Sequence, residues 1–266
     1  MSQLSLPTEC INRPIKIMLI GAGGSGSQIA IELFQMDSLL RSISNGTVYL
    51  DVTICDGDEV SLFNVGRQAF YMGDVGHNKA SVLVDRFNMF GQTNWRALTN
   101  YVNANTLTSL DTDFIITAVD KAKFRVDLGQ KLEASTSKKC LLWLDVGNGK
   151  SDGQIILGHA YQNVDVELRI PNVYDLYGSM LDSIDDEKED APSCSTEAAL
   201  QKQDFGVNRA VSGQATQLIW QLIRYGKLTH HGAFVDVLTA SVQPLKIDPA
   251  QWEVFGYANQ SKVEVN

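Results

Sequence analysis

The chain has 266 residues, of which 44% are hydrophobic, and its formal net charge is −9 at pH 7. This length and composition suit one large α/β domain with a substantial core. The negative charge argues against a general nucleic-acid binder, because neutralising phosphates requires clustered lysines and arginines. There is no signal-peptide pattern at the start and no apolar run of about 18 residues. We therefore expect a soluble cytoplasmic protein that binds neither nucleic acid nor membrane.

Strand and helix patterns alternate in the first part of the chain. Expected strands cover residues 15–20, 47–55, 95–100, 113–119 and 140–146, and expected helices cover 28–40, 78–90 and 123–133. Strands that alternate with helices indicate a mostly parallel sheet with helices on both faces. The sequence therefore predicts a Rossmann-like α/β fold.

The pattern changes after Gly149. Segments 154–159 and 164–170 read as strands with no helix between them, which predicts an antiparallel extension. The acidic residues within 181–195 repel one another and predict a solvated crossover loop. A long helix over 207–225 and a hairpin of 233–238 with 240–245 complete the chain. We expect one domain over 1–266, with a nucleotide-binding core at 14–150 and an extension at 151–266.

A glycine-rich turn follows the first strand and precedes a helical pattern. Its glycines are Gly21, Gly23, Gly24 and Gly26. Glycines here permit a tight turn and let backbone amides approach a phosphate at the helix N-terminus, where the helix dipole favours an anion. The turn predicts nucleotide binding without naming the nucleotide, because NAD and FAD enzymes use the same turn.

Two acids follow the second expected strand. In a dinucleotide-binding fold an acid at this place accepts hydrogen bonds from ribose hydroxyls, and Asp56 occupies it. Asp56 follows Gly21 by 35 positions instead of the usual spacing of about 20, so we expect an insertion around residues 38–46. The alternative interpretation is that Asp56 and Asp58 only cap a turn.

Cationic residues further along favour ATP over NAD. Attack at the α-phosphate of ATP must stabilise charge on several phosphates at once, and Arg67 and Lys79 supply positive charge. Asp120 follows the strand pattern 113–119, where a carboxylate at the carboxyl edge of a parallel sheet is well placed to hold Mg²⁺. Taken singly, Arg67 and Lys79 can be solvated, and Asp120 can cap the next helix.

The motifs in this order resemble the ThiF/MoeB/E1-like activating enzymes. They are GxGGxG at 21–26, DxDxVxxxNxxRQ at 56–68, DVGxxK at 74–79, and Asp120 with Arg125. Segments 64–68, 143–149 and 192–195 are similar to the ThiF-type proteins of the PRTRC system in particular. The resemblance runs across nearly the whole chain.

The resemblance implies an ATP-dependent, E1-like adenylyltransferase. It would join AMP to the C-terminal carboxylate of a small ubiquitin-like or sulfur-carrier-like protein and release pyrophosphate. By this analogy Asp56 binds ribose and Asp120 binds Mg²⁺. The remaining residues implied at the nucleotide are the four glycines of the turn, Asp58, Asn64, Arg67, Gln68 and Lys79. The resemblance also implies a homodimer.

Three departures from the family pattern stand out. The paired CxxC zinc site is missing, so we expect no zinc. Phe63 stands where serine or proline is common, and Lys121 places a positive charge beside the proposed metal site.

The cysteines differ in their expected roles. Cys55 and Cys140 fall in apolar strand patterns and are expected to be inert, and Cys10 lies in an expected unstructured leader. Cys194 follows the acidic segment, and a loop cysteine of related enzymes takes the activated protein as a thioester. A covalent role for Cys194 and simple adenylation both stay open, as do two rivals, an NAD- or FAD-dependent oxidoreductase and a non-catalytic E1-like scaffold.

Overall fold

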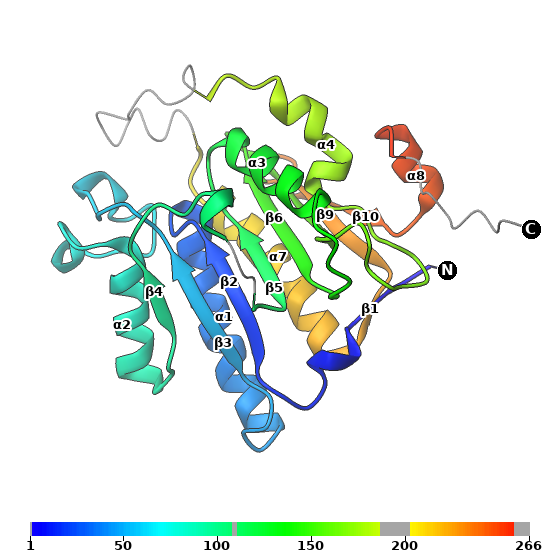
Figure 1. The fold of residues 1–266 in the computed structure, drawn as a ribbon. Coiled ribbons are helices and arrows are strands. Elements are labelled where there is room, and N and C mark those ends of the chain that lie inside the picture. The colour runs from blue at the N-terminus through cyan, green and yellow to red at the C-terminus, as the bar shows by residue number, and fades with distance from the viewer. Residues whose placement is uncertain (1, 108–110, 187–202, 258–266) are drawn as a thin grey trace, which may run out of the picture.

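The computed structural model describes residues 2–107, 111–186 and 203–257, and its centre is an eight-stranded sheet (Figure 1). The strands lie in the order β10-β9-β7-β6-β5-β2-β3-β4. They are β2 (Ile15–Ile20), β3 (Leu50–Cys55), β4 (Arg96–Leu98), β5 (Phe114–Thr117), β6 (Leu142–Asn148), β7 (Asp152–His159), β9 (His230–Asp236) and β10 (Ser241–Lys246). A separate small sheet pairs β1 (Leu4–Ser5) with β8 (Lys227–Leu228).

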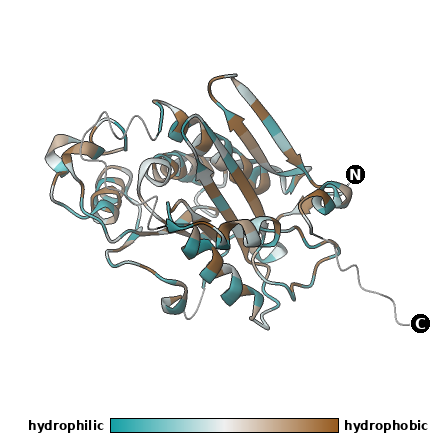
Figure 2. Cartoon of the chain, turned by 90° about the horizontal axis from the view of Figure 1, so that it is seen from above, coloured by the Kyte–Doolittle hydropathy of each residue, from teal (hydrophilic) through white to brown (hydrophobic). Residues whose placement is uncertain are grey.

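The part of the sheet from β4 to β6 is parallel, as the alternation of patterns predicts. Strand β2 lies at its centre and pairs with β3 and β5 along both edges, and its residues Ile15, Ile17, Leu19 and Ile20 are buried. Figure 2 shows hydrophobic colour on the central strands. The connecting helices are α1 (Gly24–Ile43), α2 (Lys79–Gly91) and α3 (Ala122–Glu133). The Rossmann-like fold is confirmed.

The antiparallel extension is also confirmed, but one predicted strand is wrong. β7 pairs antiparallel with β6 and β9, and β9 pairs with β10, which is the predicted terminal hairpin. Residues 164–170 form no strand. β6 pairs with residues 153–159 of β7 and β9 with its residues 152–156, so the segment 164–170 meets β7 only at its end, where the amide of His159 donates to the carbonyl of Ile170.

A helix that the sequence analysis did not predict, α4 (Val173–Asp182), precedes the acidic segment. Asn172 Oδ1 accepts the amide hydrogens of Tyr174 and Asp175, and the Asp175 carboxylate accepts the amide of Asn172. This reciprocal capping box starts the helix. The loop predicted over 181–195 is therefore wrong for residues 181, 182 and 186, which are helical, while 187–195 lie outside the described residues.

Helices cover both faces of the sheet. Helix α7 (Val207–Tyr225) coincides with the predicted long helix and packs against α1 on one face, and α3 and α4 pack together on the other (Figure 1). A short helix, α8 (Pro249–Val254), follows β10, and single 3₁₀ turns lie at 8–10, 62–64, 72–74 and 104–106. None of the helices in the described ranges is long and apolar enough to cross a membrane.

Candidate functional site

The turn between β2 and α1 is built on close backbone approaches. Gly21 has a φ of +94°, and a Cβ on it would lie 2.5 Å from the carbonyl oxygen of Ala118. A Cβ on Gly26 would overlap the carbonyl oxygen of Gly21. The first turn of α1 can therefore rest against the end of β2 only because both positions are glycine.

The N-terminus of α1 is covered on one side and open on the other. Asn208 at the start of α7 lies over Gly24, where a Cβ would come within 2.6 Å of the Asn208 amide. The Oδ1 atom of Asn208 accepts hydrogen bonds from Ser25 Oγ at 3.1 Å and from Asn148 Nδ2. A Cβ on Gly23, the N-cap, would meet no described residue within 4 Å. An anion can therefore approach the free amides of α1 at Gly23.

Asp56 directly follows β3 and is bonded to the glycine turn. Its Oδ2 accepts the amide of Ala22 at 2.6 Å, and its Oδ1 accepts the amide of Asp58 at 2.8 Å. Burial raises the pKa of Asp56 above its ordinary value in spite of these two bonds. The long spacing from Gly21 has a simple cause, because α1 runs for 20 residues before the chain returns to β3.

Asp58 joins Lys79 to a residue that the sequence analysis missed. Lys79 is the first residue of α2, only 7% exposed, and its Nζ lies 2.8 Å from Asp58 Oδ2. The hydroxyl of Tyr101 donates to Asp58 Oδ1 at 2.5 Å, and the Tyr101 ring lies over Gly57. Burial acts to raise the pKa of Asp58, but the bonds from Lys79 and Tyr101 outweigh it and lower the pKa.

Tyr101 also shows where Asp120 lies. The hydrogen bond to Asp58 raises the pKa of Tyr101 to about 12, and the charge of Asp120 contributes to the rise. Asp120 is exposed and follows β5 at the carboxyl edge. Asp56, Asp58, Lys79 and Asp120 are therefore neighbours at one edge of the sheet. No sequence signal indicated Tyr101, because it follows a three-residue strand outside every motif.

The Arg125 guanidinium supports the turn that carries Asp120 from the core side. The Arg125 guanidinium donates to the carbonyls of Val119 at 2.9 Å and Val146 at 3.0 Å, and its Nε donates to Asp145 Oδ1 at 2.8 Å. Thr117 Oγ1 donates to the same Asp145 oxygen. Asp145 is fully buried and Arg125 is 6% exposed. Through this buried pair, the backbone before Asp120 is tied to the core.

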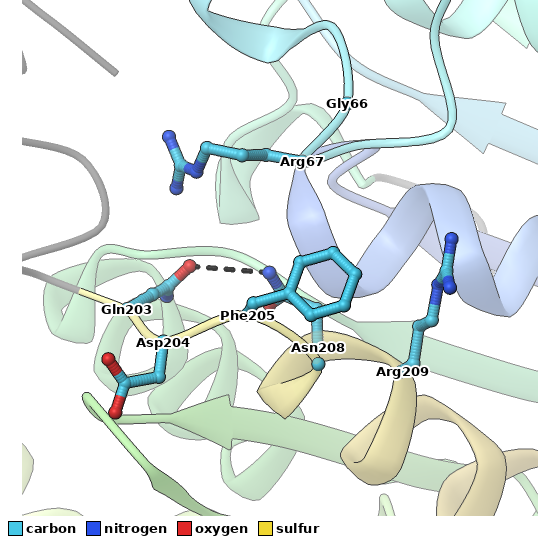
Figure 3. Close-up of a pocket in the computed structure, with 8 residues that line it drawn as sticks. Gly66, Arg67, Gln203, Asp204, Phe205, Asn208 and Arg209 are labelled. Carbon is cyan, nitrogen blue, oxygen red and sulfur yellow. Dashed lines mark hydrogen bonds between the residues drawn. The ribbon is translucent and has the colours of Figure 1, made fainter. Parts of the chain in front are cut away.

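Arg67 is a half-buried cation close to the N-terminus of α1. Its guanidinium has no hydrogen-bond or ion-pair partner within the described residues, and burial lowers its pKa. The amide of Ala69 donates to Ser27 Oγ at 3.1 Å, which ties this segment to α1. Arg67 and Asn208 line one small cavity of about 20 Å³, where Arg67 extends above residues 203–206 and Arg209 lies beyond the Phe205 ring (Figure 3).

Asn64 and Gln68, the two polar neighbours of Arg67, differ in their hydrogen bonds. Asn64 Oδ1 accepts the amide of Ser61 and closes its own turn, which leaves the amide nitrogen of the side chain for another acceptor. The Oε1 atom of Gln68 is buried and has no partner in the part of the chain that the structure describes. A buried acceptor without a donor costs free energy, so a ligand or water has reason to bind there.

A larger cavity lies at the opposite end of the sheet. It measures about 320 Å³ and is lined by Leu6, Cys10, Ile15, Val48 and Ile223, at the amino ends of β2 and β3. Its lining residues include none of the predicted site residues. The predicted site residues gather instead in the polar cluster at the carboxyl edge.

Of the cysteines, Cys55 lies in a strand as predicted, whereas Cys140 is half-buried and lies two residues before β6. Burial raises the pKa of the Cys55 thiol to about 12 and that of Cys140 to about 11, which makes both inert. Cys10 is not in an unstructured leader. It ends a 3₁₀ turn and is buried, because residues 4–10 pack against the end of α7, and its pKa is raised to about 12. Cys194 lies outside the described residues.

The fold and its glycine turn define a Rossmann-like α/β protein whose parallel sheet continues into antiparallel strands. The sequence profile of the ThiF family matches residues 11–252, and the chain belongs to this family.

The chain is also similar to known proteins and solved structures. The ATP-dependent ubiquitin transferase-like protein Cap2 of Enterobacter hormaechei subsp. hoffmannii (strain UCI 50) is 38% identical over 88 residues, which is 32% of this chain and 13% of Cap2. The crystal structure of PaaA has a TM-score of 0.61 at 16% identity, and that of E. coli MccB with ATP a TM-score of 0.58 at 14%. Each covers 90% of this chain, whereas the chain spans only 65% of either protein.

Proposed function

We propose that this chain is an ATP-dependent adenylating enzyme that acts on the C-terminal carboxylate of a small ubiquitin-like or sulfur-carrier-like protein. One observation carries the proposal. Arg67, half-buried and without a counter-ion among the described residues, shares a cavity with Asn208 close to the N-terminus of α1, whose glycine turn is bonded to Asp56. A cation that is desolvated without a counter-ion favours an anionic ligand. The triphosphate of ATP supplies that charge, and hydride transfer would not require it.

In the proposed reaction a carboxylate oxygen of the partner attacks the α-phosphorus of ATP. The bond from that phosphorus to the bridging α–β oxygen breaks, and pyrophosphate leaves with the electron pair. Asp56 accepts hydrogen bonds from the ribose hydroxyls, while the amides at Gly23 and the Arg67 guanidinium hold the phosphates. This chemistry depends on positioning and charge neutralisation, so adenylation needs no protein nucleophile.

Lys79 has a more specific role in this proposal than a general phosphate contact. Its ammonium is nearly buried and already paired with Asp58. Asp58, itself bonded by Tyr101, therefore fixes the direction of the Lys79 side chain toward the carboxyl edge. A fixed cation costs little reorganisation when the phosphates bind, which is how electrostatic stabilisation becomes effective.

The residues present fit a magnesium ion that is shared with ATP. No group of three or more metal-ligating side chains occurs within the described residues. Mg²⁺ at phosphate sites, however, usually keeps several waters and takes one or two carboxylates plus the substrate phosphates. Asp120, exposed at the carboxyl edge, would hold it in this way. When bound, Mg²⁺ would neutralise charge on the phosphates.

The relatives support the proposal without extending it to details. E. coli MccB has been crystallised with ATP, and also with AMPCPP and MccA. Cap2 is described as ATP-dependent and ubiquitin transferase-like. Together with membership of the ThiF family, these names favour ATP as the nucleotide and a polypeptide as the partner.

ATP–pyrophosphate exchange tests the proposal, with candidate small proteins that end in glycine as the second substrate. Asp120→Ala should lower exchange by about 100-fold or more, the loss typical of removing one group that stabilises transition-state charge. The matched control is Asp111→Ala, which removes an exposed carboxylate before the opposite end of β5. Equal exchange in both variants would overturn the role of Asp120.

Two further measurements separate the alternatives. Mass spectrometry of the nucleotide that copurifies with the protein distinguishes the rivals, because bound NAD or FAD would refute the ATP proposal. For Cys194 we propose a thioester with the activated partner. Cys194→Ala should then keep pyrophosphate exchange and lose the thiol-sensitive adduct, and an unchanged adduct contradicts this role.

A further inference from the structure

Helix α3 begins without a capping side chain of its own. Its N-cap residue is Lys121, whose backbone is extended and whose side chain makes no capping hydrogen bond. The first amides of a helix have no partner within the helix and need one from outside. Asp186 supplies it, because its Oδ1 accepts the amide of Ala122 and its Oδ2 accepts the amide of Lys123, both at 2.9 Å. The cap of α3 therefore comes from a distant segment just beyond α4.

This remote cap completes the support of one short turn. Residues 118–121 connect β5 to α3 and carry Asp120. From the core side, the Arg125 guanidinium holds the carbonyl of Val119 at 2.9 Å and that of Lys121 at 3.4 Å. From the outer side, Asp186 holds the two amides that follow. The backbone on both sides of Asp120 is thus tied to different parts of the chain.

Capping α3 with a distant residue costs more conformational entropy than a local cap would. A serine, threonine, asparagine or aspartate in place of Lys121 would satisfy the amide of Lys123 or Phe124, though not that of Ala122, without ordering a distant segment. The carboxylate of Asp186 does bring a negative charge to the positive end of the helix dipole, which is favourable. What a local cap does not provide is a connection between the turn of Asp120 and the segment that follows α4.

We propose that Asp186 is a positioning residue for Asp120, through which residues 183–186 set the geometry of the magnesium–phosphate part of the site. The inference rests on the proposed function. Side chains that orient a metal ligand typically change metal affinity by about 10- to 100-fold when they are removed. Asp186 is the equivalent for this turn, acting through the backbone of α3.

The experiment compares Asp186→Ala with Asp182→Ala. Asp182 is an exposed carboxylate at the end of α4, so the control removes the same charge from the same region. Binding of a fluorescent ATP derivative is titrated against Mg²⁺, and again in EDTA. Asp186→Ala should raise the Mg²⁺ concentration for half-maximal binding by about 10-fold and leave binding in EDTA unchanged. Asp182→Ala should behave as wild type.

Hydrogen exchange gives a second measurement that does not depend on activity. In Asp186→Ala the amides of Ala122 and Lys123 should exchange faster, and Asp186→Asn, which keeps one accepting oxygen, should fall between that variant and wild type. Equal loss of binding with and without Mg²⁺ would show a merely structural role, and a Mg²⁺ dependence like that of Asp182→Ala would also overturn the inference. If wild type binds no ATP under either condition, the proposed function itself fails.

Discussion

Replacement of Arg125 by methionine should destabilise the protein strongly. The guanidinium is buried against Asp145, and its removal leaves that fully buried carboxylate with Thr117 as its remaining donor among the described residues. The second oxygen, Oδ2, already has no partner in the described part of the chain. Breaking a buried ion pair from one side costs about 3–5 kcal/mol of unfolding free energy, because an uncompensated charge stays buried.

Thermal and urea unfolding measure this loss. For a chain of roughly this size each kcal/mol lowers the melting temperature by about 2–4 °C, so Arg125→Met should lower it by roughly 6–20 °C. Lys123→Met on the same helix is the control, because its pair with Asp127 is exposed and worth about 0.5 kcal/mol or less.

A double variant tests the cause. Arg125→Met combined with Asp145→Asn removes both charges, so it should be more stable than Arg125→Met alone. The reasoning is refuted if the single variant stays within about 1 kcal/mol of wild type, or if the double variant regains no stability.

The glycine turn and the buried histidines give two further predictions. Gly26→Ala should lower the melting temperature and abolish ATP binding, since its Cβ would overlap the Gly21 carbonyl, whereas Gly23→Ala, with no described residue within 4 Å, should fold like wild type. Equal melting temperatures would contradict this. Burial lowers the pKa of both His159 and His231 to about 4. Between about pH 6.5 and 4 the unfolded chain binds protons that the folded protein does not, so stability should fall on acidification by roughly 3 kcal/mol per histidine. Urea unfolding at pH 7, 6 and 5 measures this, and His231→Gln should reduce the slope, to which His230 also contributes because burial lowers its pKa. A slope that stays unchanged in that variant would contradict a lowered pKa of His231.

Elements that bury one continuous apolar pattern were predictable from the sequence. The strand at 15–20 and the helix at 207–225 have the predicted bounds, because burial on β2 and α7 follows the period of each element. Helix α4 was missed because the acids after it dominate the composition, although Asn172 and Asp175 carry the spacing of a capping box. The alternating pattern of 164–170 led to a wrong strand prediction, because alternation does not show whether a neighbouring strand has a free edge to pair with.

Part of the candidate site was likewise predictable from the sequence, and part was not. Motif spacing located Asp56, Lys79 and Asp120, and the structure brings them to one edge of the sheet. Motif spacing could not show that Lys79 is already paired with Asp58, nor that the Tyr101 hydroxyl also bonds to Asp58. Asn208 and Asp186 could not be predicted either, because each reaches its helix N-terminus through a tertiary contact, 183 residues away in the sequence for Asn208 and 64 for Asp186.

The packing of α7 against α1 has a consequence for synthesis on the ribosome. The apolar side of α1 is complete once residue 43 has emerged, but the helix that covers it spans 207–225. Strand β7 likewise waits for β9 before its outer edge is paired. Domains generally fold as units during translation, so the nascent core should keep an exposed apolar face and an open strand edge until most of the chain is made. Chaperone binding to nascent chains that end before and after α7 would reveal that interval.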